Sequence, residues 1–201
     1  DYYNTLGITV YTWRPLESYW REGYLPAFIS AAQSIKPPKP ADYSVDDAKA
    51  TLKKYAKAYD KSDAAKSDER AAAKEQFDSE KPTVIAIMNE TFSDLSIYQN
   101  MRAGYEGPQY FKSLSNCLSR GKLYVSAYGG GTANTEFEFL TGNSMANLGS
   151  GVYPYTIYNM ETTENLAEQF KSLGYATTAM HPNHATNWNR ENVYKDFGFD
   201  Q

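Results

Sequence analysis

The sequence predicts an α/β domain with a largely parallel central sheet, preceded by a helical arm. Two observations predict the sheet. Short apolar runs begin after Pro82 and alternate with helical segments, and polar residues follow each run. A third observation predicts the arm, because residues 1–43 are aromatic and irregular and polar helical stretches follow them before Pro82. We therefore expect a linker and helical arm over residues 1–80 and the N-terminal part of the α/β domain over 81–201.

Two helices are expected in the arm. Ser44 and Asp47, three residues apart, resemble a capping box at a helix start. Residues at helical spacing follow: Leu52, Tyr55, Ala56 and Tyr59. A second helix, rich in Ala, Lys and Glu, is expected over residues 64–77, and its charges are typical of a solvated helix face.

Three strands are expected in the domain, over residues 83–88, 122–128 and 175–180. The first is a continuous apolar run, which is typical of a strand buried on both faces of a parallel sheet. A parallel sheet of three strands is small, so we expect further strands outside this chain. The incomplete sheet would have an exposed edge, to which a second copy of the chain can pair.

Helices are expected between these strands over three segments: 108–118, 133–140 and 164–173. Glycines that can stop a helix follow them: Gly121, Gly142 and Gly174. Pro108 is suited to the first turn of the first helix. The single cysteine, Cys117, is expected on the apolar face of that helix as an inert, buried thiol.

Composition excludes several classes of protein. A net charge of −4 and a sequence pI of about 5.3 argue against a nucleic-acid partner. One cysteine rules out an internal disulfide and a cysteine zinc cluster. No apolar run reaches the roughly 18–20 residues that span a bilayer. The first residues lack the pattern of a signal peptide and an initiator Met, so we expect the chain to be part of a longer protein.

Polar residues follow each expected strand. Glu90 comes after the first, the run Gly129–Thr132 after the second, and His181 and Asn183 after the third. Ligands of open α/β sheets bind beyond the carboxyl ends of the strands, so Glu90, Thr132 and His181 are expected at one edge of the sheet. Taken singly, each has a plainer interpretation, as a helix-start carboxylate, a helix N-cap and a loop histidine.

These residue types suit phosphoryl transfer. Carboxylate and hydroxyl oxygens are ligands for hard cations, so Glu90 and Thr132 are candidate ligands of Mn²⁺ or Mg²⁺. A bound cation would make the Thr132 hydroxyl a better nucleophile, and the preceding glycines leave room for a phosphate. His181 can donate to a phosphate oxygen. Trp188 offers an apolar wall, and Arg190 either clamps a phosphate or pairs with a surface carboxylate. The glycine run lacks the Lys-Ser/Thr of a P-loop.

The motifs together resemble a known family. The stretch GGGTANTEFEFLTG (Gly129–Gly142) is the most specific, and NETFSD (Asn89–Asp94), His181-Pro182, Trp188–Arg190 and Tyr194 accompany it. This set resembles the lipoteichoic acid synthase family, which are phosphoglycerol transferases of the sulfatase/alkaline-phosphatase superfamily. The resemblance is strong over residues 82–201 and loose over the first 80.

The resemblance implies an alkaline-phosphatase-like sandwich fold and an enzyme at the extracellular face of a bacterial membrane. Such an enzyme moves glycerol phosphate from phosphatidylglycerol to a polyglycerolphosphate (lipoteichoic acid) chain through a phospho-threonine intermediate. It implies that Thr132 is the nucleophile, that Glu90 is a Mn²⁺ ligand, and that residues 1–80 are an extracellular linker to a transmembrane domain. Substrate contacts are implied for His181, Trp188 and Arg190, and a further one is expected at Asn183.

The chain departs from the family pattern in one respect. The family completes its metal site with a downstream Asp-His pair and has a further substrate histidine, and neither is found before Gln201. We therefore expect the 201-residue chain to be inactive alone unless another chain supplies these groups.

Two other classes of function stay open: a sulfatase or other hydrolase of the same superfamily, and a non-catalytic binding module. A true sulfatase is disfavoured, because it needs Cys or Ser in a C/S-x-P-x-R context. Thr132 has neither the required side chain nor the Pro and Arg that should follow. A hydrolase that releases glycerol phosphate to water would use the same nucleophile. A non-catalytic module that binds glycerophosphate polymers would need no nucleophile at all.

Overall fold

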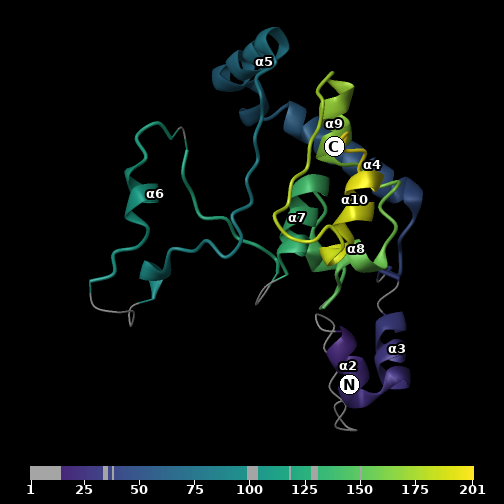
Figure 1. Cartoon of the computed structure of the whole chain (residues 1–201). Coiled ribbons are helices and arrows are strands. Elements are labelled where there is room, and N and C mark those ends of the chain that lie inside the picture. Colours follow the sequence, from purple (N-terminus) through teal and green to yellow (C-terminus); the bar gives the residue numbers. More distant parts are fainter. Residues whose placement is uncertain are drawn as a thin grey trace. The chain divides into compact units, whose positions relative to one another are not determined.

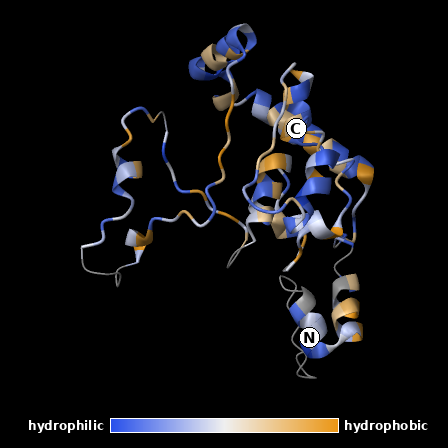
Figure 2. Cartoon of the chain, in the orientation of Figure 1, coloured by the Kyte–Doolittle hydropathy of each residue, from blue (hydrophilic) through white to orange (hydrophobic). Residues whose placement is uncertain are grey.

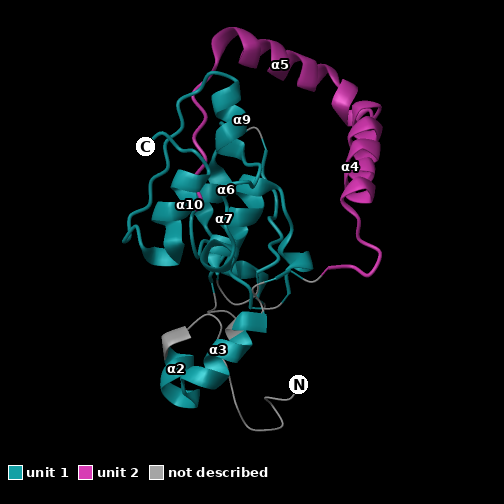
Figure 3. Cartoon of the chain, turned by 90° about the vertical axis from the view of Figure 1, so that its right-hand side faces the viewer, with its two compact units in different colours: residues 1–38, 89–201 teal, residues 39–88 magenta. Residues whose placement is uncertain are grey.

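The computed structural model describes residues 15–33, 36–37, 39–98, 104–117, 119–127, 131–149 and 151–201. The described elements are helical (Figure 1). They form two compact units, one of residues 39–88 and the other of the described parts of 1–38 and 89–201 (Figure 3). The predicted boundary near residue 80, between arm and catalytic part, stays a prediction. Among the described residues, every helix is too short or too polar to cross a membrane.

The unit that contains the described parts of residues 1–38 and 89–201 begins with a helical hairpin. Helix α2 (Pro15–Glu22) and helix α3 (Tyr24–Gln33) are joined by Gly23, which has a φ of +87°. Glycine adopts this left-handed conformation without the steric cost of a Cβ, so it allows the chain to reverse in one residue. The sequence pattern had not predicted these two helices.

The unit of residues 39–88 confirms the two predicted polar helices. Helix α4 (Val45–Asp60) starts at Ser44, whose Oγ accepts from the Asp47 N–H at 3.0 Å. A 3₁₀ turn, η1 (Ala64–Lys66), leads to α5 (Asp68–Glu80). Neither α4 nor α5 has a buried residue, which agrees with the predicted solvated charges.

The predicted strands are not formed in the part of the chain that the structure describes. Residues 83–88 run as an extended, apolar segment without a partner strand (Figure 2), and Ile87 is 83% exposed. Residues 122–127 also form no strand and bend at Ser126, and Leu123 is 82% exposed. Residue 128 lies outside the described residues. A strand needs a neighbouring backbone for its N–H and C=O groups, and no described segment supplies one here.

The third predicted strand, residues 175–180, makes a short backbone pairing. The Asp200 N–H donates to the Thr177 oxygen at 2.9 Å, and the Ala179 N–H donates to the Gln201 oxygen at 2.8 Å. These bonds join the segment to the chain end, but they are too few to make a strand. The predicted free sheet edge, and pairing with a second copy through it, stay predictions.

The segment between residues 89 and 127 is mostly irregular. It contains a 3₁₀ turn, η2 (Leu95–Ile97), and α6 (Gln109–Ser113), so the helix predicted over 108–118 ends five residues early, and Leu118 lies outside the described residues. The prediction of a buried Cys117 is wrong, because the thiol is exposed after α6 and its Sγ donates to the Ser119 oxygen. Cys117 lies beyond the end of α6 at Ser113, so it is not on a helix face.

The hydrophobic core lies in residues 131–199. It is built by α7 (Thr132–Thr141), η3 (Met145–Asn147), α8 (Pro154–Ile157), α9 (Leu166–Ser172), η4 (Asn187–Asn189) and α10 (Arg190–Asp196). Helices α7 and α9 were predicted. The fully buried Tyr155 meets Phe137 of α7 at 6.3 Å between ring centroids, and Phe197, after α10, at 6.0 Å, both edge to face. These contacts join α7, α8 and α10 (Figure 1).

Replacing Phe197, which is 0% exposed, with Ala should lower the free energy of unfolding by about 3–5 kcal/mol, because it leaves a cavity beside Tyr155. Urea unfolding followed by circular dichroism measures this. Phe139 is 54% exposed on α7, so Phe139→Ala is the matched control and should cost far less. Equal losses in the two variants would contradict the assignment of Phe197 to the core.

Acid should weaken the attachment of the chain end. Hydrogen bonds from Lys171 and from the Thr177 N–H lower the pKa of Asp200 below its usual value. The lowered pKa means that Asp200 stabilises the fold above pH ~4 and loses this effect as pH falls through its folded pKa. The stability difference between wild type and Asp200→Asn should therefore shrink below pH ~4 in thermal unfolding. A difference that is constant down to pH ~2 would contradict it.

Candidate active site

The predicted nucleophile opens helix α7. Thr132 is the first residue of the helix, and Gly131 before it has a φ of +79°. Gly129 and Gly130 lie outside the described residues. The Gly131 oxygen accepts from the Asn134 N–H at 2.9 Å, which closes the first turn. Thr132 is half-buried and makes no capping hydrogen bond, so the plainer interpretation as an N-cap is wrong. The Thr132 hydroxyl therefore does not cap the helix. It lies at the N-terminus of α7, where the helix dipole favours anions.

Three of the predicted site residues meet one another. Glu90 Oε1 lies 3.4 Å from His181 Nε2 and 3.6 Å from Arg190 Nη2. His181 Nδ1 accepts from the Asn183 N–H at 3.2 Å, so the neutral ring would carry its proton on Nε2, facing Glu90. His181 and Arg190, which follow Glu90 by 91 and 100 positions in sequence, thus both lie near the same carboxylate oxygen of Glu90.

Arg190 is the buried member of this group. The residue is 2% exposed, and its Nε lies 3.3 Å from Glu136 Oε2 on α7. The other oxygen of Glu136 accepts from the Tyr194 hydroxyl at 2.9 Å. Burial, and then the negative charge of Glu136, raise the pKa of Tyr194, so its phenol stays a donor at all ordinary pH values.

An aromatic pair connects Trp188 to the start of α7. The Trp188 ring lies 4.8 Å from the Tyr153 ring, centroid to centroid, and a Cβ at Gly131 would lie 3.3 Å from Tyr153 Cε1. Trp188 and the following Asn189 both have a φ of +58°. A left-handed conformation is strained for Trp, and the surroundings over-determine it, because Asn189 Nδ2 donates to the Tyr155 oxygen at 2.8 Å.

Asn183 shapes its own loop. Its side-chain oxygen accepts from the His184 N–H at 2.7 Å, and the residue is exposed. The predicted substrate contact of Asn183 stays a prediction.

Sequence reasoning missed Glu136 and Tyr153 as parts of this site. Glu136 lies four residues after Thr132, and residues at that spacing share a face of a helix, so the helix prediction held a signal for it. Its partner Arg190 is 54 positions away, and that pairing has no local signal. Tyr153 precedes the short α8, which the sequence pattern did not predict.

The metal site is incomplete in the described residues. Glu90 and Thr132 offer the hard oxygen atoms that Mn²⁺ or Mg²⁺ prefers, so the donor types fit. No described hydrogen bond or ion pair joins the two, and the described residues contain no group of three or more His, Cys, Asp or Glu side chains able to hold a metal. Glu90 instead meets His181 and Arg190.

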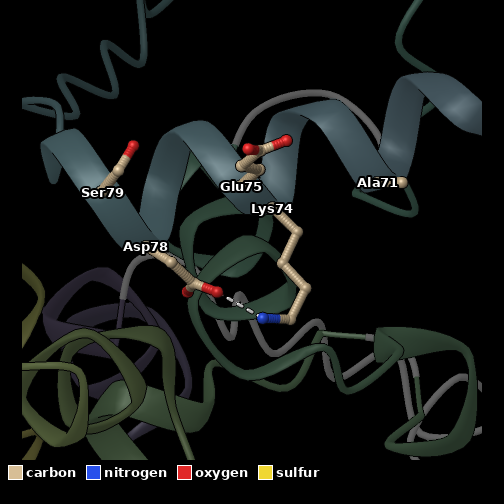
Figure 4. A pocket seen from close by; sticks show the side chains of 5 residues that line it. All are labelled: Ala71, Lys74, Glu75, Asp78 and Ser79. Carbon is tan, nitrogen blue, oxygen red and sulfur yellow. Dashed lines mark hydrogen bonds and ion pairs between the residues drawn. The ribbon is translucent and has the colours of Figure 1, made fainter.

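A shallow hollow also lies along α5, far in sequence from these residues. Figure 4 shows the five side chains that line it: Ala71, Lys74, Glu75, Asp78 and Ser79. All belong to one helix, and Lys74 pairs with Asp78 four residues on. It is an open helix face that carries none of the predicted site residues, so we exclude it as the active site.

Comparison with known proteins defines the class. Residues 82–201 match the sequence model of the sulfatase family, and the chain belongs to that family. A sulfatase domain implies an alkaline-phosphatase-like fold, although the sheet of that fold is not formed in the part of the chain described above. Enzymes of this superfamily are metal-dependent, and most are hydrolases or transferases.

The chain is similar in sequence to two curated proteins. The chain is 38% identical over 120 residues to a putative cyclic beta-1,2-glucan modification protein of Rhizobium meliloti, covering 60% of this chain and 18% of the relative. It is 30% identical over 124 residues to a lipoteichoic acid synthase of Staphylococcus saprophyticus subsp. saprophyticus, covering 60% and 19%. The chain thus spans about a fifth of the length of these relatives. No solved structure matches it.

Replacing Gly131 with Ala should lower the free energy of unfolding and disturb the packing of Tyr153. Both Gly131 and Gly142 are left-handed, so Ala at either position should cost about 1–2 kcal/mol. Gly142 has no other atom near its missing Cβ, whereas Gly131 faces Tyr153 at 3.3 Å. Gly131→Ala should therefore lower the free energy of unfolding more than Gly142→Ala and shift the Trp188 fluorescence. Equal losses without that shift would contradict the packing of Tyr153 on Gly131.

Proposed function

We propose that the protein is a metal-dependent phosphoglycerol transferase at the extracellular face of a bacterial membrane. It takes glycerol phosphate from phosphatidylglycerol and adds it to a polyglycerolphosphate chain. The observation that carries the proposal is the meeting of Glu90, His181 and Arg190 in the same unit as Thr132. Similarity to a lipoteichoic acid synthase supports this substrate class and the extracellular location.

The reaction needs a nucleophile, and we assign this role to Thr132, the first residue of α7. Its Oγ1 attacks the phosphorus of phosphatidylglycerol, the bond from phosphorus to the diacylglycerol oxygen breaks, and diacylglycerol leaves with the hydroxyl proton. Glycerol phosphate then remains as an ester on Thr132. A hydroxyl of the acceptor chain attacks the same phosphorus, and Thr132 leaves and regains a proton.

The surrounding side chains stabilise the phosphate during both steps. Arg190 offers the donors that match phosphate oxygens, and His181 offers Nε2–H. The dipole at the start of α7 favours the negative charge beside Thr132. Trp188 and Tyr153 form an apolar wall near Gly131, which suits the carbon side of a glycerol group.

Glu90 and Thr132 would contribute to a Mn²⁺ or Mg²⁺ site together with ligands that the described residues do not supply. When bound there, a divalent cation would supply the Lewis acidity that makes the Thr132 hydroxyl a better nucleophile. To act as a ligand, Glu90 has to exchange its contacts with His181 and Arg190, and a phosphate that binds those two groups would release it.

A second candidate differs in the acceptor. The relative from Rhizobium meliloti, which is more similar in sequence, is described as a glucan modification protein. That similarity favours transfer of the same group to a sugar hydroxyl. Because the donor-side residues are common to both candidates, only the acceptor has to be tested.

Replacing Thr132 with Ala should abolish transfer, with a loss of at least about a thousandfold, because the nucleophile is removed. The assay follows label from glycerol-labelled phosphatidylglycerol into polyglycerolphosphate or cyclic glucan, with the protein as its gene encodes it. Thr135→Ala, on the same helix, is the matched control and should keep most of the activity.

The products of this assay distinguish the transferase from a hydrolase, and the phenotype of Thr132→Ala distinguishes it from a binding module. Label found in free glycerol phosphate, irrespective of acceptor, would show a hydrolase. Unchanged biological function of Thr132→Ala would favour a module that only binds glycerophosphate polymers, and would contradict the proposed transferase.

A further inference from the structure

Helices α7 and α10 share a buried ion pair that the proposed chemistry does not itself require. Arg190 and Glu136 have side chains only 3% and 12% exposed. Burying a charge is costly unless it is paired and hydrogen-bonded, and the side of Arg190 that faces Glu136 meets this condition. The pair therefore fixes one edge of the guanidinium.

Glu136 is itself held in place from α10. One of its oxygens lies 3.3 Å from Arg190 Nε, and the other accepts from the Tyr194 hydroxyl at 2.9 Å. Arg190 and Tyr194 are one helical turn apart, so both partners of the carboxylate come from the same face of α10. The carboxylate cannot rotate without losing a charge-assisted hydrogen bond.

The other edge of the guanidinium has donor capacity left over. Arg190 Nη2 is buried and makes no hydrogen bond in the described part of the chain. It lies 3.6 Å from Glu90 Oε1, and that same oxygen is 3.4 Å from His181 Nε2. An oxyanion therefore fits between Arg190 and His181, and the carboxylate of Glu90 marks its position.

We propose that Glu136 and Tyr194 are positioning residues, which hold Arg190 so that its Nη2 edge faces a phosphate ester beside His181. This inference rests on the proposed function. It adds that the phosphate contact depends on a carboxylate that never touches the substrate. Glu136 keeps the guanidinium plane fixed, and Tyr194 keeps Glu136 fixed.

The test compares substitutions on the two acidic residues of α7. Glu136→Gln should remove the negative charge that pairs with Arg190 Nε–H and leave only a neutral hydrogen bond, which holds the guanidinium less firmly. In the protein as its gene encodes it, we expect this to raise KM for phosphatidylglycerol, and the Kd of glycerol 1-phosphate in calorimetry, by about ten- to hundredfold. Tyr194→Phe removes one hydrogen bond and should raise both by about two- to tenfold. Glu136→Asp should recover part of the loss.

Glu138→Gln is the matched control. Burial acts to raise the pKa of Glu138, but the Met145 N–H and the serines 126 and 144 outweigh it and lower the pKa, so Glu138 stabilises the fold without contacting Arg190. It should lower the melting temperature and leave KM close to that of the wild type. Equal increases in KM for Glu136→Gln and Glu138→Gln would mean a general structural effect and would overturn the inference.

Arg190→Lys separates this inference from the proposed function. If Arg190→Lys weakens glycerol 1-phosphate binding and Glu136→Gln does not, the positioning role is wrong and the phosphate contact stands. If Arg190→Lys leaves binding unchanged, the phosphate contact proposed for Arg190 is itself wrong. Increases for both variants, with Glu138→Gln unaffected, support the inference.

Discussion

The edge-to-face packing of Tyr155 between Phe137 and Phe197 is the interaction on which the described hydrophobic core depends. It joins α7, α8 and the end of α10, which otherwise lie far apart in sequence. Every residue of the candidate site except Glu90, His181 and Asn183 is carried on or beside these elements. Because the packing sets the separation of α7 and α10, it also sets the distance between Glu136 and Arg190.

The electrostatics of the site follow from that separation. A buried guanidinium requires a carboxylate, and α7 supplies one at position 136. The remaining edge of Arg190 then meets Glu90 and His181, so positive and negative groups share a small volume. In the proposed function, a phosphate would take the place of the Glu90 carboxylate, so phosphate binding and the release of Glu90 would be coupled. The metal dependence of the family is consistent with a carboxylate that can be exchanged in this way.

The apolar segments 83–88 and 122–127 are not packed, in contrast to the helices of the core. Their sequences are typical of buried strands, yet their side chains are exposed, since no described segment pairs with them. A strand's stability depends on a neighbouring strand and a covering layer, whereas a helix closes its own hydrogen bonds. Membership of the sulfatase family implies a fold in which the chain would have such neighbours. The chain spans about a fifth of the length of the two relatives.

The sequence by itself determined several of the helices and the superfamily. The capping residue Ser44 and the glycine after α7 predicted helices that the structure contains, and the motif around Thr132 predicted the sulfatase superfamily. Local hydrogen bonding and spacing are enough for such features. Only the tertiary structure decided that Glu90 meets His181 and Arg190, that Glu136 pairs with Arg190, and that residues 83–88 remain unpaired. These facts depend on contacts between positions 50 to 100 residues apart, and spacing along a single sequence does not encode which distant groups share a buried volume.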